Sequence, residues 1–286
     1  MMQAASRRIL RHPEDWRTLT LVALTCGSLI VPYAHTPGSW QATPWIAITA
    51  LLCFAANIAN HNHMHRATFR RRALNIAFNL VLSICRGHTA SGIIVPHHLN
   101  HHVESGGMGD WIRPQLAGSG IGWLRLIRFV LAASISMIVE RRRPAAPRLG
   151  ARAESCRRLE VAVLAAFILF GLVADWRVFL LFNVSPWALG LAMLVGINLL
   201  QHDDCTAGAV VGGSRDFIGG LGNWLFLNNG YHTAHHLSPG THWSRLPELH
   251  ARIAGRIRER GLERESVLAY LWRFAWTRAP AVSKRG

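Results

Sequence analysis

Four long apolar runs constrain this chain more than any other feature of its sequence. They cover residues 18–34, 45–60, 159–174 and 177–201. A helix needs about 17–25 apolar residues to cross a bilayer, and lipid excludes open structures that leave backbone polar groups unsatisfied. The second and third runs are slightly short, so they need neighbouring residues or a locally thinned bilayer. The runs predict an all-α integral membrane protein with four transmembrane helices.

Basic residues indicate how these helices are oriented. Arginines lie before the first run, after the second and before the third, at Arg7, Arg8, Arg11, Arg17, Arg66, Arg70, Arg71, Arg72, Arg157 and Arg158. The connection between the first two runs, residues 36–44, has no Lys or Arg, and that between the third and fourth has only Arg177. Because cytoplasmic loops carry an excess of basic residues, we expect both termini and the histidine-rich segments described below to face the cytoplasm. We therefore expect a multi-pass protein of a bacterial cytoplasmic membrane.

Two further segments are apolar but interrupted by polar residues. Residues 73–95 hold Arg86, His88 and two glycines, and residues 121–139 hold Arg125 and Arg128. Both patterns favour helices that lie at the membrane interface. Either segment could instead be a further span, and if only one crossed, the histidine-rich segments would be divided between the two sides of the bilayer.

The C-terminal part of the chain has a different pattern. Residues 246–277 predict two amphipathic cytoplasmic helices, with Trp272 and Trp276 suited to a membrane interface. We expect one membrane-embedded domain over residues 1–286, with its core at about 45–250 and an amphipathic tail at 246–286. Interfacial helices and a cytoplasmic histidine-rich cap would complete the four spans.

Most of the 16 histidines fall in four short stretches. These are HNHMH from His61, HHLNHH from His97, a single His202, and HTAHH from His232. On a helix, residues at i, i+3 and i+4 share one face. Three groups have that spacing: His61 and His65; His98, His101 and His102; and His232, His235 and His236. Each group can therefore direct two or three imidazoles at one point.

Imidazole binds zinc, copper, iron and nickel. One zinc takes four ligands, whereas nine histidines are matched in spacing or position here, which indicates two metal ions. Carboxylates near the clusters are few, and Asp110 and Asp203 are candidates to orient histidines through the second ring nitrogen. His63 and His97 are candidates for the same outer layer or for alternate ligands. His250 and the other isolated histidines lack partners at ligand spacing.

These residues resemble the membrane-bound fatty acid desaturases and the related hydroxylases. The pattern of that family is HxxxH or HxxxxH, then HxxHH, then a second HxxHH late in the chain, often preceded by NxxxH. The corresponding pairs here are His61–His65, His98–His102 and His232–His236, with Asn198 and His202 as the NxxxH element. The resemblance spans about residues 45–250. The stretch NNGYHTAHHLSPGTHWSRLP also looks like that of sphingolipid desaturases and of carotenoid ketolases, so it leaves the substrate open.

The resemblance implies a di-iron centre that uses O2 as co-substrate. The implied iron ligands are His61, His65, His98, His101, His102, His202, His232, His235 and His236, and Asn198 would hold a water on one iron. The implied chemistry removes hydrogen from an unactivated C–H bond of a lipid or fatty acyl substrate. Loss of two hydrogens gives an alkene and oxygen rebound gives an alcohol, and the motifs do not separate these outcomes.

The sequence departs from the family pattern in two ways. His97 doubles the start of the second box, and we favour His98 because it restores HxxHH. The chain has no HPGG-type haem-binding motif, so electrons must come from a separate ferredoxin- or cytochrome-type donor. The formal net charge of +16 suits an acidic donor and membrane lipids. Nucleic acid is not expected as a partner, because the arginines flank apolar runs instead of forming a compact motif.

Two other functions remain open from the sequence. A hydroxylase or ketolase acting on a lipid, carotenoid or alkane would use the same fold. A polytopic zinc-binding membrane protein, either a transporter or a hydrolase, is the alternative of another class. A transporter would place polar ligands near mid-membrane, where these runs are apolar, and a zinc protease would want HExxH, which the sequence lacks.

Overall fold

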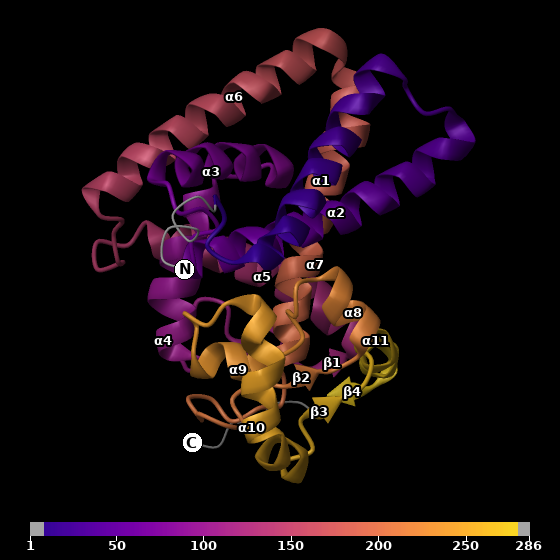
Figure 1. The fold of residues 1–286 in the computed structure, drawn as a ribbon. Helices are drawn as coiled ribbons and strands as arrows, with labels where there is room; N and C mark the ends of the chain where they lie inside the picture. Colours follow the sequence, from indigo (N-terminus) through magenta and orange to yellow (C-terminus); the bar gives the residue numbers. More distant parts are fainter. Residues whose placement is uncertain (1–8, 280–286) are drawn as a thin grey trace. The chain divides into compact units, whose positions relative to one another are not determined.

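The computed structural model describes residues 9–279 and is built mainly of helices (Figure 1). The α-helices are α1 (Trp16–Ala34), α2 (Ser39–His65), α3 (Arg72–Arg86), α4 (His102–Glu104), α5 (Gly122–Arg141), α6 (Ala151–Phe179), α7 (Ser185–His202), α8 (Gly220–Leu225), α9 (His232–Leu237), α10 (Leu246–Glu259) and α11 (Val267–Trp276). Short strands β1 (Gly120–Ile121), β2 (Asp216–Phe217), β3 (Glu263–Arg264) and β4 (Arg278–Ala279) form two small sheets. This confirms the all-α class. Arg7, Arg8 and residues 280–286, on which part of the expected orientation and tail rest, lie outside the described residues.

The described chain divides into two compact units. Unit 1 comprises the residues up to Ile93 together with Leu149–Met193, and unit 2 comprises Ile94–Arg148 together with the residues from Leu194 onward. One boundary falls inside α7, and the other falls between the 3-10 helix Ala90–Ile93 and the π-helix Ile94–His101. The single domain expected from the sequence stays a prediction.

In unit 1, α1 and α2 form a helical hairpin (Figure 1). The chain leaves α1 at His35, and α2 begins after Gly38. Polar atoms tie the two helices across their apolar contact: the Trp45 indole N–H donates to the carbonyl of Ser28 at 3.0 Å. This hydrogen bond satisfies the indole N–H, which the surrounding apolar side chains could not do.

The apolar stretch from residue 151 to residue 202 is broken at Asp175. This residue has extended backbone angles (φ −164°, ψ 104°) between helical neighbours. Its Oδ1 accepts hydrogen bonds from the backbone N–H groups of Arg177 and Val178, at 2.9 and 3.2 Å. That is the geometry of a helix N-cap. The third and fourth apolar runs therefore lie on two helical segments that are separated by a capped turn.

Residues 73–95 do not form the single interfacial helix expected from the sequence. The helix α3 ends at Arg86, because Gly87 takes a left-handed conformation (φ +70°). A Cβ at Gly87 would lie only 2.4 Å from the Trp187 ring, so glycine meets both the conformational and the steric requirement there. The chain becomes helical again at Ala90.

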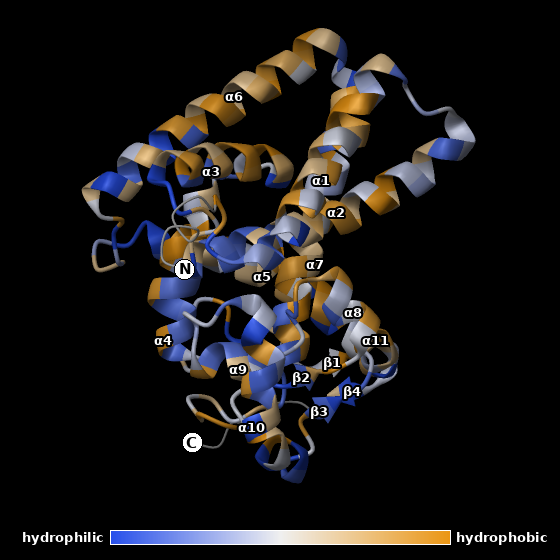
Figure 2. Ribbon diagram, in the orientation of Figure 1, coloured by the Kyte–Doolittle hydropathy of each residue, from blue (hydrophilic) through white to orange (hydrophobic). Residues whose placement is uncertain are grey.

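Four helical stretches in the described residues are long and apolar enough to cross a membrane: Pro13–Ala34, Ser39–His65, Gly122–Arg141 and Ala151–His202. The bent pair on either side of Gly87 would raise the number to five. Figure 2 shows apolar residues along α1, α2 and α6, and on α6 the side chain of Val173 is 78% exposed. An exposed surface this apolar suits lipid and not water. The set includes α5, which the sequence favoured as interfacial while leaving a span open.

Unit 2 contains α5 and the polar C-terminal part of the chain. Strand β1, just before α5, pairs antiparallel with β4, and β2 pairs parallel with β3. The two helices expected in residues 246–277 are present as α10 and α11. Helix α10 buries Leu246, Ile253 and Ile257 along one face, as an amphipathic helix does.

Candidate metal centre

The first histidine box lies at the end of α2, in unit 1. His61 and His65 are one helical turn apart, and their ring centroids are 4.8 Å from each other. His63 points to another side of the helix, where its Nδ1 accepts a hydrogen bond from the Thr68 N–H at 3.1 Å and its ring packs against Phe78. The α-helical repeat explains this separation, since i and i+4 share a face and i+2 does not. The ring nitrogens of His63 do not lie close to those of the other possible metal ligands among the described residues.

The segment that leads into the second box is anchored within unit 1. The side-chain amide of Asn60 donates to the carbonyl of Ala90 at 3.1 Å, and the hydroxyl of Ser83 accepts from the Ala90 N–H at 2.9 Å. The carboxylate of Glu160 accepts from both the N–H and the hydroxyl of Ser91, at 2.9 and 2.7 Å. These contacts fix Ala90 and Ser91, among the last residues of unit 1 before the second box, against α2, α3 and α6.

The second box is not α-helical. Residues Ile94–His101 form a π-helix, whose hydrogen bonds run from i to i+5. Residues five apart are therefore neighbours, and the ring centroids of His97 and His102 are 4.6 Å apart. The i, i+3, i+4 rule used for the sequence does not hold here. Short π-helical segments are rare and occur frequently at functional sites.

Four histidines of unit 2 converge on one point. They are His101, His202, His232 and His236, and one ring nitrogen from each lies within 4.8 Å of the others. His101 comes from the π-helix, His202 from the end of α7, and the remaining two from α9. We call this set the four-histidine group. All four were predicted as ligands from the sequence.

Two members of this group have their outer nitrogen occupied by an acceptor. The Nδ1 of His101 lies 2.7 Å from a carboxylate oxygen of Asp110 and the Nδ1 of His202 lies 2.9 Å from the carbonyl of Gly213. A carbonyl or carboxylate oxygen can only accept, so each Nδ1 carries the proton and each neutral ring keeps a lone pair on Nε2. The inner nitrogens of these two rings are therefore available to bind a metal ion.

Asp110 is itself held firmly in its loop. Its carboxylate also accepts from the N–H groups of Gly106 and Ile112, at 2.8 and 2.9 Å. Burial by itself would raise the pKa of Asp110, but the hydrogen bonds from His101 and from the two amides hold the pKa below its usual value. Asp110 is thus an ionised carboxylate that orients a histidine, as the sequence predicted for it.

Neighbouring inner nitrogens of the four-histidine group lie within hydrogen-bond distance of one another. The Nε2 of His232 is 2.8 Å from that of His202 and 3.1 Å from that of His236. Burial, and after it the neighbouring histidines, lower the pKa of His232 and of His236 well below the ordinary histidine value, so these rings are neutral. A neutral His232 can direct at most one N–H from its Nε2, so it cannot donate a well-formed hydrogen bond to His202 and to His236 at once. A metal ion bound between these nitrogens would be shared by all of them.

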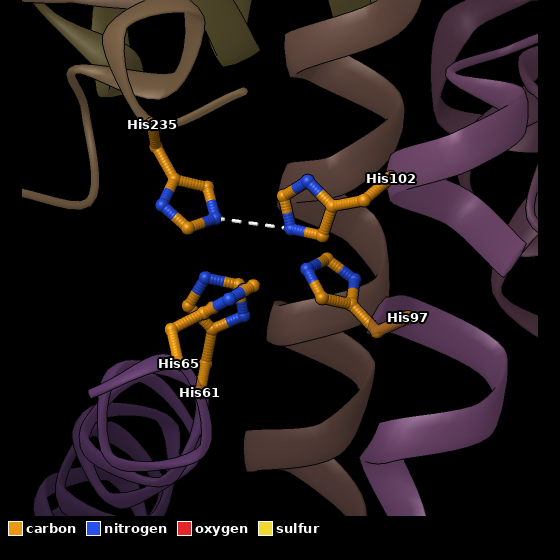
Figure 3. Close-up of side chains that lie close together, drawn as sticks. All are labelled: His61, His65, His97, His102 and His235. Carbon is orange, nitrogen blue, oxygen red and sulfur yellow. Dashed lines mark hydrogen bonds between the residues drawn. The ribbon is translucent and has the colours of Figure 1, made fainter. Parts of the chain in front are cut away.

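A second set of histidines in unit 2 has the same character. His97, His102 and His235 each offer a ring nitrogen within 4.8 Å of the others, and the Nε2 atoms of His235 and His102 are 3.1 Å apart (Figure 3). The structure includes His97 in this set and does not include His98, whereas the sequence favoured His98. The π-helix is the physical reason, because its wider turn aligns His97 with His102.

Asn198 lies on α7, one turn before His202. Its side-chain nitrogen is 3.3 Å from the Nε2 of His101. Its Oδ1 is buried and has no hydrogen-bond partner among residues 9–279. A buried amide oxygen without a partner costs about 1–3 kcal/mol, so its place beside the four-histidine group fits an additional ligand or water.

Asp203 does not orient a histidine. It forms a two-pronged ion pair with Arg125 of α5, at 2.6 and 3.0 Å. Sequence reasoning also missed the carbonyl of Gly213, and no residue type could have signalled it, since every residue has a backbone carbonyl. The structure thus separates the two aspartates that the sequence treated alike.

A comparison with protein-family models finds a match to the fatty acid desaturase family over residues 34–267. The chain belongs to the fatty acid desaturase family. A search of curated proteins finds no match. The match covers all three histidine boxes and Asn198, so it confirms the resemblance found in the sequence. Desaturases and hydroxylases of this family are membrane oxidoreductases and typically depend on metal.

The residues present fit the metal dependence of a desaturase-family enzyme. The donor set is made wholly of imidazole nitrogens, which suits iron, zinc, copper or nickel. The inner nitrogens of His202 and His232 lie 2.8 Å apart in a buried space, and the unpartnered amide oxygen of Asn198 lies near the four-histidine group. The site therefore fits a bound metal ion, on which enzymes of this family typically depend.

Proposed function

We propose that this chain is an O2-dependent di-iron oxidoreductase that desaturates a fatty acyl lipid. The observation that supports this most strongly is the four-histidine group, whose neutral inner nitrogens are fixed by Asp110 and by the carbonyl of Gly213. In the overall reaction, one saturated C–C bond, O2, two electrons and two protons give one C=C bond and two waters. Bound iron supplies the activation of O2 and the removal of hydrogen from an unactivated C–H bond.

The proposed ligands are histidines from all three boxes and from α7. The four-histidine group would hold one iron, and His97, His102 and His235 would contribute to the other. His61 and His65 are proposed as ligands from their spacing on α2 and from the family pattern. Asn198 would hold a water through its unpartnered Oδ1.

The protein's own residues would prepare this site in three ways. Asp110 keeps the proton on the outer nitrogen of His101, and the Gly213 carbonyl does the same for His202. This leaves strong neutral donors aimed inward without any proton having to leave the site. The apolar helices would bring a lipid substrate to the metal ligands, which we expect at helix ends and not in mid-membrane.

We further propose that a separate ferredoxin- or cytochrome-type protein supplies the electrons. The net charge of +16 would attract an acidic donor to the cytoplasmic side. The arginines that flank the apolar runs support the orientation in which both termini and the histidines face the cytoplasm of a bacterium.

Metal analysis of the detergent-purified protein tests the proposal. We expect about two irons per chain after growth on iron-57, with Mössbauer spectra of a coupled pair when oxidised. His232→Ala should lose iron from the four-histidine group, whereas His35→Ala, at an exposed histidine outside all boxes, should keep both. Stoichiometric zinc that persists after anaerobic reconstitution with iron would contradict the proposal and support the zinc-binding alternative.

Lipid analysis of an expressing strain separates the possible oxidation products. New alkenes in the fatty acyl chains would support desaturation. New alcohols or ketones, with two irons bound, would keep the di-iron proposal and move the reaction to hydroxylation or ketolation.

A further inference from the structure

The short helix α9 carries three proposed ligands but has little to hold it in place by itself. It spans only His232–Leu237, and its N-cap residue Tyr231 makes no side-chain capping hydrogen bond. A helix this short is not stable in isolation. Its position must therefore come from contacts with other elements of unit 2.

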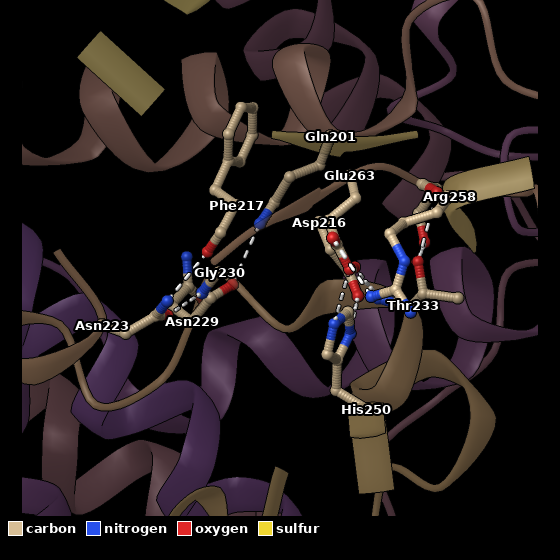
Figure 4. Close-up of polar contacts among 11 residues, drawn as sticks. Gln201, Asp216, Phe217, Asn223, Asn229, Gly230, Thr233, His250, Arg258 and Glu263 are labelled. Atoms are coloured by element: carbon tan, nitrogen blue, oxygen red, sulfur yellow. Dashed lines mark hydrogen bonds and ion pairs between the residues drawn. The ribbon is translucent and has the colours of Figure 1, made fainter. Parts of the chain in front are cut away.

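Strand β2 provides these contacts. The carboxylate of Asp216 accepts from the Thr233 N–H at 2.6 Å, and the Phe217 N–H donates to the Gly230 carbonyl at 2.9 Å (Figure 4). Asn223 closes the arrangement, since its side chain donates to the Phe217 carbonyl and accepts from the Gly230 N–H. The N-terminal turn of α9 and the loop before it are thus both fastened to β2.

The same stretch of chain also holds the end of α7. The Arg215 N–H donates to the carbonyl of Gln201 at 2.6 Å, and the Gly213 carbonyl orients His202. Residues 213–217 therefore connect the two helices that supply His202, His232 and His236 to the four-histidine group. Any shift of this stretch would move these ligands relative to one another.

Asp216 is in turn fixed by a buried charged cluster that lies apart from the metal ligands. The Nδ1 of His250 lies 2.8 Å from a carboxylate oxygen of Asp216, and its Nε2 lies 3.0 Å from one of Glu263 (Figure 4). Asp216 and Glu263 are direct partners in the β2–β3 pairing. Arg258 also lies 3.5 Å from Glu263. His250 thus has a carboxylate at each ring nitrogen, and only the imidazolium can donate hydrogen bonds from both nitrogens.

We propose that Asp216 and His250 are positioning residues that hold α9, and with it three of the metal ligands, in place. The metal part of this inference rests on the proposed function, whereas the tethering of α9 does not. Besides the two carboxylates, the Tyr231 ring faces His250 with its centroid 5.0 Å away. Burial opposes the charged form, but the hydrogen bonds and charges of Asp216 and Glu263 outweigh it and raise the pKa of His250 above the ordinary value.

Hydrogen exchange of the full-length protein tests the tether without relying on activity. We expect Asp216→Asn and His250→Gln to lower the protection of amides in residues 232–237 by roughly tenfold, because the Thr233 N–H loses its charged acceptor. Iron affinity should fall by about tenfold in the same variants. Glu248→Gln is the matched control. Glu248 lies on α10, as His250 does, and its exposed carboxylate pairs with Arg245, just before that helix. This control substitution should change neither quantity.

The pH profile separates positioning from a general loss of stability. A raised pKa means that the stabilisation is complete below the ordinary histidine pKa and is lost as pH rises through the folded-state pKa. Protection of residues 232–237, corrected for intrinsic exchange, should therefore fall with rising pH. Glu263→Gln removes one carboxylate and should move that midpoint to lower pH, even if Asp216→Asn fails to fold.

Three outcomes would overturn the inference: unchanged protection in the variants, an unchanged midpoint in Glu263→Gln, or lower protection with unaltered metal affinity. If the protein binds zinc and not iron, the proposed function fails. The exchange data and the affinity for zinc still decide whether α9 is held by this cluster.

Discussion

Asp110→Asn is expected to lower the affinity of the four-histidine group for iron by about 10–100-fold. The carboxylate accepts three hydrogen bonds, from His101, Gly106 and Ile112. An asparagine has only one acceptor oxygen, so in either orientation its NH2 group would face an N–H donor. His101 would lose its fixed tautomer or its orientation, and the removal of the negative charge would make its inner nitrogen a weaker ligand.

Titration of the apo-protein with ferrous iron against a competing chelator would measure this change. Asp203→Asn provides the control, because Asp203 is bound to Arg125 and not to a histidine. We expect Asp203→Asn to lower stability while leaving the iron affinity of the folded protein close to that of the wild type. Equal losses of affinity in the two variants would contradict the assignment of Asp110 as the orienting carboxylate.

Gly87→Ala is expected to lower the free energy of unfolding by about 3 kcal/mol. The left-handed conformation at Gly87 costs an alanine about 1–2 kcal/mol. The added Cβ would also overlap the Trp187 ring, which belongs to the buried core of unit 1. Displacing a packed aromatic ring adds about 1–3 kcal/mol.

Gly208→Ala separates the two contributions. Gly208 has nearly the same backbone angle (φ +72°), but no atom lies within 4 Å of the position of its Cβ. We expect a loss of about 1 kcal/mol there, seen as a smaller decrease in the thermal unfolding midpoint in detergent. Equal decreases for the two variants would show that the contact with Trp187 is unimportant.

The apolar runs were sufficient to predict an all-α membrane protein, because a bilayer admits few structures and the length of a span is set by its thickness. The division of the fourth helical stretch was also visible in the sequence, since Asp175 lies between two apolar runs. The break at Gly87 was not predicted. Gly87 ends the helix in a left-handed conformation, and it packs against Trp187, a residue distant in the sequence that no local pattern could indicate.

The histidine boxes led to the correct family, and four of the nine histidines implied as ligands converge as the four-histidine group. In the second box the HxxHH pattern favoured His98, whereas the π-helix aligns His97 with His102. Local periodicity predicts neighbours only while the helix type is known. Whether this segment becomes an α-helix or a π-helix depends on how other elements pack around it. That packing cannot be derived from the local sequence.

The sequence by itself determined the membrane class, the family and the residue types that can bind metal, because these follow from composition and from spacing within one helix. Only the tertiary structure decided that Asp110 and not Asp203 orients a histidine, that a backbone carbonyl orients His202, and that His250 lies between two carboxylates. These three depend on contacts between elements distant in the chain. Such contacts are set by how whole elements pack, and not by the identity of either partner alone.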